Sequence, residues 1–162
     1  MKIGVISDTH ISDKTQELPV KIKEAFKGVD MIIHVGDLVE LSVLEKLRKI
    51  CSDVRGVCGN MDPQEVRKTL REKEIITAGK YRIGVMHGIG APVNLIDVTT
   101  EAFKNDRVDA IIFGHSHNGL NMVKNGILYF NPGSPTDKVY AKVNSVGIIE
   151  VNDKIEGRII EI

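Results

Sequence analysis

The sequence has no excess of charge of either sign. Its 162 residues include 22 lysine and arginine residues and 22 aspartate and glutamate residues, which gives a formal net charge of zero at pH 7. Proteins that bind nucleic acids or anionic membrane surfaces attract them with a basic field, and this composition supplies none. We therefore expect no nucleic-acid partner and no membrane partner, and we expect a small molecule as the substrate.

Long apolar runs are missing as well. A membrane-spanning helix needs about 20 consecutive apolar residues, and no stretch of this sequence approaches that length. The N-terminal KIGVIS reaches Asp8 too soon for a signal peptide. These observations predict a cytoplasmic protein. The length suits a single domain spanning 1–162 and leaves open whether the chain forms a homo-oligomer.

Cysteine is scarce, with only Cys51 and Cys58. The segment between them has the composition of a strand, and seven extended steps would separate their Cα atoms by roughly 23 Å, whereas a disulfide needs less than about 7 Å. Their spacing also differs from the CxxC of structural zinc sites. We therefore expect two free thiols, with Cys58 as a small buried side chain.

Short apolar runs alternate with charged segments of helical character, which is the pattern of an α/β fold. The runs predict strands at 2–7, 31–35, 54–58, 82–87 and 110–114, and helices are expected at about 16–27, 42–49, 63–72 and 92–105. Beyond Gly119, the pair Asn125-Gly126 between two apolar runs predicts a hairpin, and a second hairpin is expected around Asn152-Asp153. The sequence thus predicts parallel strands in the first part of the chain and antiparallel strands after Gly119.

Polar side chains that bind metals follow five of the predicted strands. They are Asp8, His10, Asp37, Asn60, His87, His115 and His117. Because ligand-binding loops of an α/β sheet gather at the carboxyl ends of its strands, we expect these side chains to converge. Oxygen and imidazole donors without a thiolate suit divalent metal ions. Seven donors exceed what one ion takes from a protein, so the set predicts two ions that share a carboxylate.

The local sequence around these donors also favours one site. Residues two apart in an extended segment point the same way, so Asp8 and His10 can face one site, and so can His115 and His117. Glycines adjoin four of the strand ends, at Gly36, Gly59, Gly88 and Gly114. They allow the backbone to turn sharply and ions to approach the main chain.

Taken in order, these motifs resemble those of a known family. Asp8-x-His10, Gly36-Asp37, Gly59-Asn60-x-Asp62, His87-Gly88 and Gly114-His115-x-His117 resemble the calcineurin-like metallophosphoesterases. The NPGS segment at 131–134 is similar to the small single-domain phosphodiesterases of bacteria and archaea within that family. The resemblance covers essentially the whole chain. It implies an α+β sandwich of two mixed β-sheets flanked by helices, which agrees with the α/β beginning and the antiparallel end.

The resemblance also implies residue roles and an activity. One ion would be held by Asp8, His10 and His117, and a second by Asn60, His87 and His115, with Asp37 bridging the two. The ions implied are divalent, Mn²⁺ first, with Ni²⁺, Fe²⁺, Zn²⁺ or Co²⁺ as alternatives. Water between two such ions loses a proton near neutral pH. Its attack on phosphorus would hydrolyse a small phosphoester, and the branch of the family points to a phosphodiester.

Met61 departs from the family pattern. Many members carry a histidine directly after the asparagine ligand, where it helps the leaving oxygen depart or holds the phosphate. A thioether donates no proton, so either another donor serves or the leaving group needs little help. Among the other polar residues, His34 is interpreted as a hydrogen-bonded structural residue. Asp62 is interpreted as the cap of the helix beginning at Pro63, as a companion of Asn60, or as both.

Two other functional classes serve as alternatives. One eukaryotic retromer sorting subunit keeps this fold as an interaction scaffold with an altered site, whereas all seven positions here carry residues that bind metals. A nucleotide-binding regulator would be expected to carry GxGxxG or GxxxxGK[ST], and neither motif occurs. The sequence therefore predicts a metal-dependent hydrolase, with a non-catalytic scaffold as the alternative.

Overall fold

The computed structural model describes all 162 residues, and its strands form two five-stranded sheets. The first sheet, in the order β10-β9-β1-β2-β3, contains β1 (Lys2–Ile6), β2 (Met31–Val35), β3 (Val54–Val57), β9 (Ser145–Val151) and β10 (Ile155–Glu161). The second, in the order β4-β5-β6-β8-β7, contains β4 (Lys73–Ala78), β5 (Tyr81–Met86), β6 (Ala110–Ile112), β7 (Gly119–Lys124) and β8 (Ile127–Pro132). The helices are α1 (Val20–Ala25), α2 (Ser42–Arg48), α3 (Gln64–Thr69), the 3₁₀ turn η1 (Pro92–Asn94) and α4 (Leu95–Ala102).

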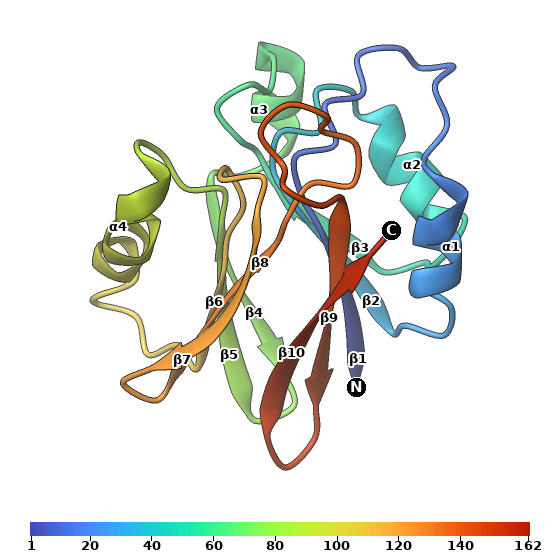
Figure 1. The fold of residues 1–162 in the computed structure, drawn as a ribbon. Coiled ribbons are helices and arrows are strands. Elements are labelled where there is room, and N and C mark those ends of the chain that lie inside the picture. Colours follow the sequence, from blue (N-terminus) through green and yellow to red (C-terminus); the bar gives the residue numbers. More distant parts are fainter.

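The two sheets pack face to face, with helices on their outer sides (Figure 1). In β2, Met31, Ile33 and Val35 belong to a cluster of 16 buried residues drawn from both sheets. Ile32, between them, points the other way and packs with residues of α1 and α2. Burying one such aliphatic side chain contributes about 1.5–3 kcal/mol. Alternate side chains of β2 therefore pack into the core between the sheets and into the layer between the first sheet and its helices.

Both sheets are mixed, as predicted. In the first sheet, β1, β2 and β3 pair in parallel, and β9 adds to β1 in the antiparallel sense. In the second, β5, β6 and β8 are parallel, whereas β4 and β7 are antiparallel edge strands. Both predicted hairpins form, as β7–β8 and β9–β10. Asn125 and Gly126 have φ of 52° and 80°, as a two-residue turn with a right-handed strand twist requires.

Several element boundaries differ from those predicted. The sequence does not predict β4, because this edge strand begins with charged residues and exposes alternate side chains. The first helix begins only at Val20, since Pro19 lacks the N–H that a helix interior needs. The third helix ends at Thr69, and Leu70 already has an extended backbone that leads into β4. The fourth helical segment starts as the 3₁₀ turn η1 and ends at Ala102.

The predicted state of the cysteines is confirmed. Cys51 and Cys58 are both free, and Cys58 is buried in the cluster between the first sheet and its helices. Burial raises the pKa of the Cys58 thiol, which favours its neutral form. No helix of the structure has the length and apolar character needed to cross a membrane.

Candidate metal centre

The loops that follow the parallel strands of both sheets meet at one rim of the molecule. Backbone hydrogen bonds hold them together, including Asp8 N–H to the Gly36 carbonyl and Gly114 N–H to the His87 carbonyl, each at 3.0 Å. Five of the predicted residues form two overlapping groups, Asp8 with His10 and His117, and Asp8 with Asp37 and His87. Within each group the potential ligand atoms all lie within 4.8 Å of one another.

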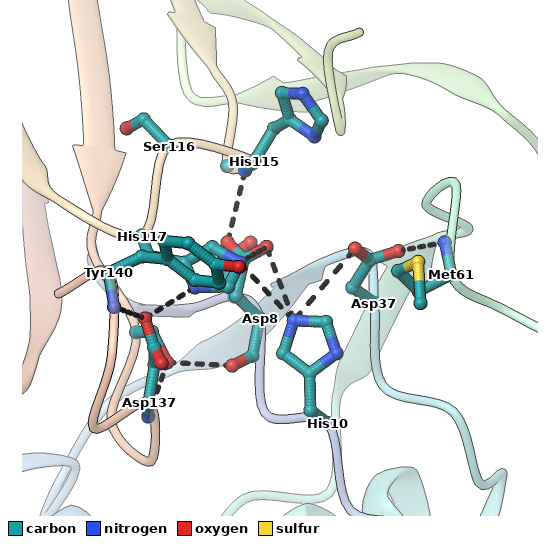
Figure 2. Close-up of polar contacts among 12 residues, drawn as sticks. Asp8, His10, Asp37, Met61, His115, Ser116, His117, Asp137 and Tyr140 are labelled. Atoms are coloured by element: carbon teal, nitrogen blue, oxygen red, sulfur yellow. Dashed lines mark hydrogen bonds and ion pairs between the residues drawn. The ribbon is translucent and has the colours of Figure 1, made fainter. Parts of the chain in front are cut away.

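Two carboxylates lie at the centre of this arrangement (Figure 2). Asp8 and Asp37 are almost fully buried, with exposed fractions of 0% and 2%. Asp8 Oδ1 lies 3.3 Å from Nε2 of His117, 3.7 Å from that of His87 and 3.9 Å from that of His10. Asp37 Oδ2 lies 3.1 Å from His87 Nε2 and 3.9 Å from His10 Nε2. Each carboxylate therefore faces histidines of both groups.

Three histidines are oriented by acceptors outside this centre. His87 Nδ1 lies 2.7 Å from the Val35 carbonyl, His117 Nδ1 lies 2.7 Å from Asp137 Oδ2, and His115 Nε2 lies 2.8 Å from the Gly90 carbonyl. These oxygens only accept hydrogen bonds, so the ring nitrogens donate, and the other nitrogen of each neutral ring keeps its lone pair. Contacts of this kind fix the tautomer and direction of imidazoles that bind metals.

The second ring nitrogens of His87 and His117 face carboxylate oxygens. His87 Nε2 and Asp8 Oδ1 are buried and have no hydrogen-bond partner, and His87 Nε2 instead faces the carboxylate of Asp37 at 3.1 Å. Buried acceptors that oppose one another are costly unless a proton or a cation lies between them. The donor set of carboxylates and imidazoles, without a thiolate, therefore fits divalent cations.

Asn60 and His115 lie beside the two groups rather than within them. Asn60 Oδ1 is 2.9 Å from His115 Nδ1, and the His115 ring packs edge-on against the ring of His87, with centroids 5.3 Å apart. The backbone N–H of His115 donates to Asp8 Oδ2 at 3.0 Å. All seven predicted residues thus surround one site, with this pair on the His87 side.

The backbone at the site is not extended, which corrects the expectation based on two-residue spacing. Positive φ values occur at Asp8 (53°), His10 (45°), Asp37 (54°), His115 (68°) and His117 (57°). Left-handed backbone costs roughly 1–2 kcal/mol per residue, and such strain concentrates at functional sites. Asp8 and His10 converge through turns, whereas His115 and His117 enter different parts of the site.

The four glycines beside the donors serve two purposes. Gly36 and Gly88 have φ of 92° and 93°, so they turn the chain after β2 and β5. Gly59 and Gly114 instead give room, because a Cβ at Gly59 would overlap the Asp37 carboxylate, and one at Gly114 would overlap Ser7 and approach Asp8 Oδ2. Close approach of the loops to the two carboxylates therefore requires glycine at both positions.

Asp62 does not cap α3, contrary to one of its predicted roles. Pro63 occupies the N-cap position, and no side chain caps that helix. Asp62 Oδ2 instead accepts hydrogen bonds from the N–H groups of Asp37 and Gly59 at 3.0 and 2.7 Å, and Oδ1 accepts one from Val39 at 2.7 Å. The carboxylate joins the loops after β2 and β3 and so fixes the position of Asp37.

Asp137 is a site residue that the sequence does not reveal. Besides His117, its carboxylate accepts the N–H groups of Val139, Tyr140 and Ala141 at 2.7–2.9 Å. Burial by itself would raise the pKa of the Asp137 carboxyl, but these donors and His117 lower that pKa to about 2. The carboxylates of Asp8 and Asp137 raise the pKa of His117 to about 9. A lone aspartate in a polar loop gives no sequence signal for this role.

The NPGS segment holds the loops of the site in place. Ser134 Oγ donates to the Asp8 carbonyl at 2.7 Å, and Asn131 Nδ2 donates to the Gly114 carbonyl at 2.7 Å. His34, in contrast, lies away from the two groups on the helix-covered side of β2, where its Nε2 is 3.1 Å from Thr9 Oγ1. Burial lowers the pKa of His34 to about 3, so the ring is neutral. These contacts agree with the structural role expected for His34.

Two cavities lie next to His10 and His117. Both are lined by His10, His117 and Tyr140. The Lys138 cavity, of about 410 Å³, is completed by Thr9, Gln16, Thr136, Asp137 and Lys138. The Met61 cavity, of about 400 Å³, is completed by Asp37, Asn60, Met61, Pro92, His115 and Ser116. A larger cavity of about 530 Å³, lined mainly by β7 and β10, contains none of the predicted site residues.

Comparison with known proteins shows which proteins this chain is similar to. A family model described as the calcineurin-like phosphoesterase superfamily domain matches residues 1–154. A probable metallophosphoesterase of Methanocaldococcus jannaschii is 37% identical over 163 residues, which cover 100% of this chain and 82% of the relative. Vacuolar protein sorting-associated protein 29 of Schizosaccharomyces pombe is 28% identical over 158 residues, covering 96% and 80% of the two chains. The solved structure of an archaeal phosphodiesterase shares the fold, with a TM-score of 0.78 and 24% identity over 100% of both chains.

Proposed function

Because the chain belongs to the calcineurin-like phosphoesterase superfamily, we propose that it is a metal-dependent hydrolase of small phosphodiesters. The observation that carries the proposal is the buried cluster of Asp8, Asp37 and His87, in which Asp8 Oδ1 and His87 Nε2 have no hydrogen-bond partner. Such a set is stabilised by cations. Membership in the superfamily and this donor set support the same chemistry independently.

The proposal assigns a role to each predicted residue. Asp8, His10 and His117 hold one divalent ion, and Asn60, His87 and His115 hold a second, with Asp37 between them. When bound, such a pair supplies Lewis acidity and lowers the pKa of water towards neutrality. Mn²⁺ is the preferred ion, with Ni²⁺, Fe²⁺, Zn²⁺ or Co²⁺ as alternatives. Asp37 Oδ2 faces His10 and His87, one from each set, which supports its bridging role.

The two cavities favour a phosphodiester over a monoester. A phosphate beside His10 and His117 has room for one substituent in the Lys138 cavity and for another in the Met61 cavity. A monoester would leave one of these cavities filled only with water. No lysine or arginine lines the Met61 cavity, so the chain places no cation there for a second phosphate group.

The direct test combines metal analysis with a comparison of two nitrophenyl esters. Protein reconstituted with Mn²⁺ or Ni²⁺ should hold close to two ions per chain and should hydrolyse bis(p-nitrophenyl) phosphate faster than p-nitrophenyl phosphate. Metal removal by a chelator should abolish turnover, and return of the ion should restore it. Protein that binds no divalent ion and hydrolyses neither ester would refute the proposal.

The second candidate function is a non-catalytic interaction scaffold of the same fold. It is favoured by the 28% identity to vacuolar protein sorting-associated protein 29 and by exposed apolar side chains such as Tyr140, which is 72% exposed. The complete set of seven donors favours the enzyme instead. Metal binding with no hydrolysis of either ester would favour the scaffold.

A further inference from the structure

Exposed apolar side chains gather around the candidate site. Ten large hydrophobic residues are exposed, and six of them lie on loops or in η1 at the rim that bears the site: Met61, Ile89, Val93, Val139, Tyr140 and Val143. Apolar groups rimming a polar centre are typical of ligand-binding surfaces. The substrate is therefore expected to present an apolar surface next to its phosphate.

Met61 and Tyr140 carry this inference furthest, because they line the same cavity as the candidate metal ligands. They are 61% and 72% exposed, and they lie on opposite sides of His10 in Figure 2. The Tyr140 ring packs edge-on against the His117 ring, with centroids 5.8 Å apart. The backbone of this loop is fixed by a hydrogen bond that the Tyr140 N–H donates to the Asp137 carboxylate. A fixed aromatic face and a thioether thus border the place where a phosphate substituent would lie.

We propose that the Met61 cavity binds a flat aromatic group of the substrate, either an aryl ring esterified directly to the phosphate or the base of a nucleoside esterified to it through the sugar. This inference rests on the proposed phosphoesterase function. Aromatic rings pack favourably on other rings and on thioether sulfur, and the remaining apolar wall is Pro92. The cavity volume of about 400 Å³ lies in the range of small-ligand sites. Because no lysine or arginine lines the cavity, a substituent that carries a further phosphate does not fit its chemistry.

The test compares two ligands that differ only in the ring. Phenylphosphonate and methylphosphonate carry the same anion and are not hydrolysed, so calorimetric titration of the metal-loaded protein reports binding alone. Phenylphosphonate should bind about tenfold more tightly. Tyr140→Ala and Met61→Ala should each reduce this ratio about threefold or more, whereas Tyr140→Phe should preserve it. Val123→Ala, at a residue that is 67% exposed on β7, is the matched control and should also preserve it.

A second ligand pair separates the two sources of the ring. Thymidine 5′-monophosphate and deoxyribose 5-phosphate differ by the base, and a ratio larger than that of the phosphonates would identify a nucleobase as the natural group. A smaller ratio would identify a simple aryl group. Equal binding of the two phosphonates, with hydrolysis of bis(p-nitrophenyl) phosphate intact, would overturn this inference and leave the proposed function standing. Tighter binding of phenylphosphonate than of methylphosphonate, without hydrolysis of bis(p-nitrophenyl) phosphate, would overturn the proposed function.

Discussion

Asp137 orients the ring of His117, because Asp137 Oδ2 accepts a hydrogen bond from His117 Nδ1 at 2.7 Å. The opposite nitrogen, Nε2, is thereby directed at Asp8 Oδ1, 3.3 Å away. Three backbone N–H groups in turn fix the carboxylate of Asp137. Asp137 is thus a positioning residue, because it reaches the centre of the site only through His117.

The first prediction concerns Asp137→Asn. The amide keeps one acceptor oxygen for the backbone but can no longer hold His117 as a carboxylate does, so metal affinity should fall about 10- to 100-fold. The dissociation constant of Mn²⁺ measured by titration checks this, and the urea midpoint of the metal-free protein monitors folding. Asp153→Asn, in the exposed turn between β9 and β10, is the control. Wild-type affinity in the Asp137 variant would contradict the positioning role.

The second prediction is a pH dependence of stability in the metal-free protein. The folded-state pKa of His117 is raised to about 9, so its contribution is complete below the unfolded value of about 6.5 and is lost as pH rises through about 9. The folded-state pKa of Asp137 is lowered to about 2, so its contribution is present above about 4 and is lost as pH falls through about 2. Urea unfolding of wild type and His117→Gln should therefore differ most between about pH 4 and 6.5. A difference that does not change with pH would argue against the ion pair.

A third prediction separates donors from neighbouring polar residues. Asp37→Asn should abolish most turnover and reduce the number of bound metal ions, because Asp37 lies between both sets of histidines. His34→Gln is the contrast, since His34 contacts Thr9 rather than the centre. It should lower the melting temperature through its buried position yet keep the metal content. Equal loss of metal in the two variants would show that this separation is wrong.

The positions of the donors could be predicted from the sequence because they follow a rule of chain direction. Parallel strands carry their carboxyl ends to one edge of a sheet, so Asp8 and Asp37, which follow the paired strands β1 and β2, were expected to lie close together. His87 follows β5 of the second sheet and approaches them because the two sheets pack against each other. The buried apolar runs made those strands visible. β4 was not predicted, because it begins with two charged residues and contains only the short apolar pair Ile75-Ile76.

The contacts that support the donors could not be predicted, because they depend on loop geometry. Asp62 and Asp137 accept hydrogen bonds from backbone N–H groups that lie 2 to 25 residues away in the sequence. No periodicity encodes such contacts. The left-handed backbone at His115 and His117 likewise arises from the packing of several loops, so the spacing rule assumed an extended backbone that the structure does not have.

A fourth prediction follows from the contacts of Asp62. Removal of its carboxylate leaves the N–H groups of Asp37, Gly59 and Val39 without their acceptor in a largely buried place. Asp62→Ala should therefore lower the free energy of unfolding by about 3 kcal/mol and should also weaken metal binding, since Asp37 loses its support. Chemical denaturation of the metal-free protein measures the first effect. Asp13→Ala, at an exposed aspartate whose side chain accepts hydrogen bonds from Thr15 alone, should change neither quantity.

The last prediction concerns Met61, where the family pattern has a proton donor. The Met61 N–H donates to Asp37 Oδ1 at 2.7 Å, and its side chain lines the cavity beside His10 and His115. A change of the side chain therefore keeps the backbone contact and alters only the chemistry of the cavity. Because a thioether donates no proton, the rate of the wild-type protein should depend steeply on how well the leaving group carries negative charge.

Met61→His should change that dependence selectively. General acid help is worth about 10² to 10⁴ in rate, and it is worth most for basic leaving groups. Esters of poor leaving groups should therefore gain most, and the plot of log kcat/KM against leaving-group pKa should become flatter. Met61→Gln, a polar side chain without an acidic proton, is the matched control and should keep the steep slope. A shallow slope already present in the wild-type protein would mean that another residue protonates the leaving group and would contradict this account of Met61.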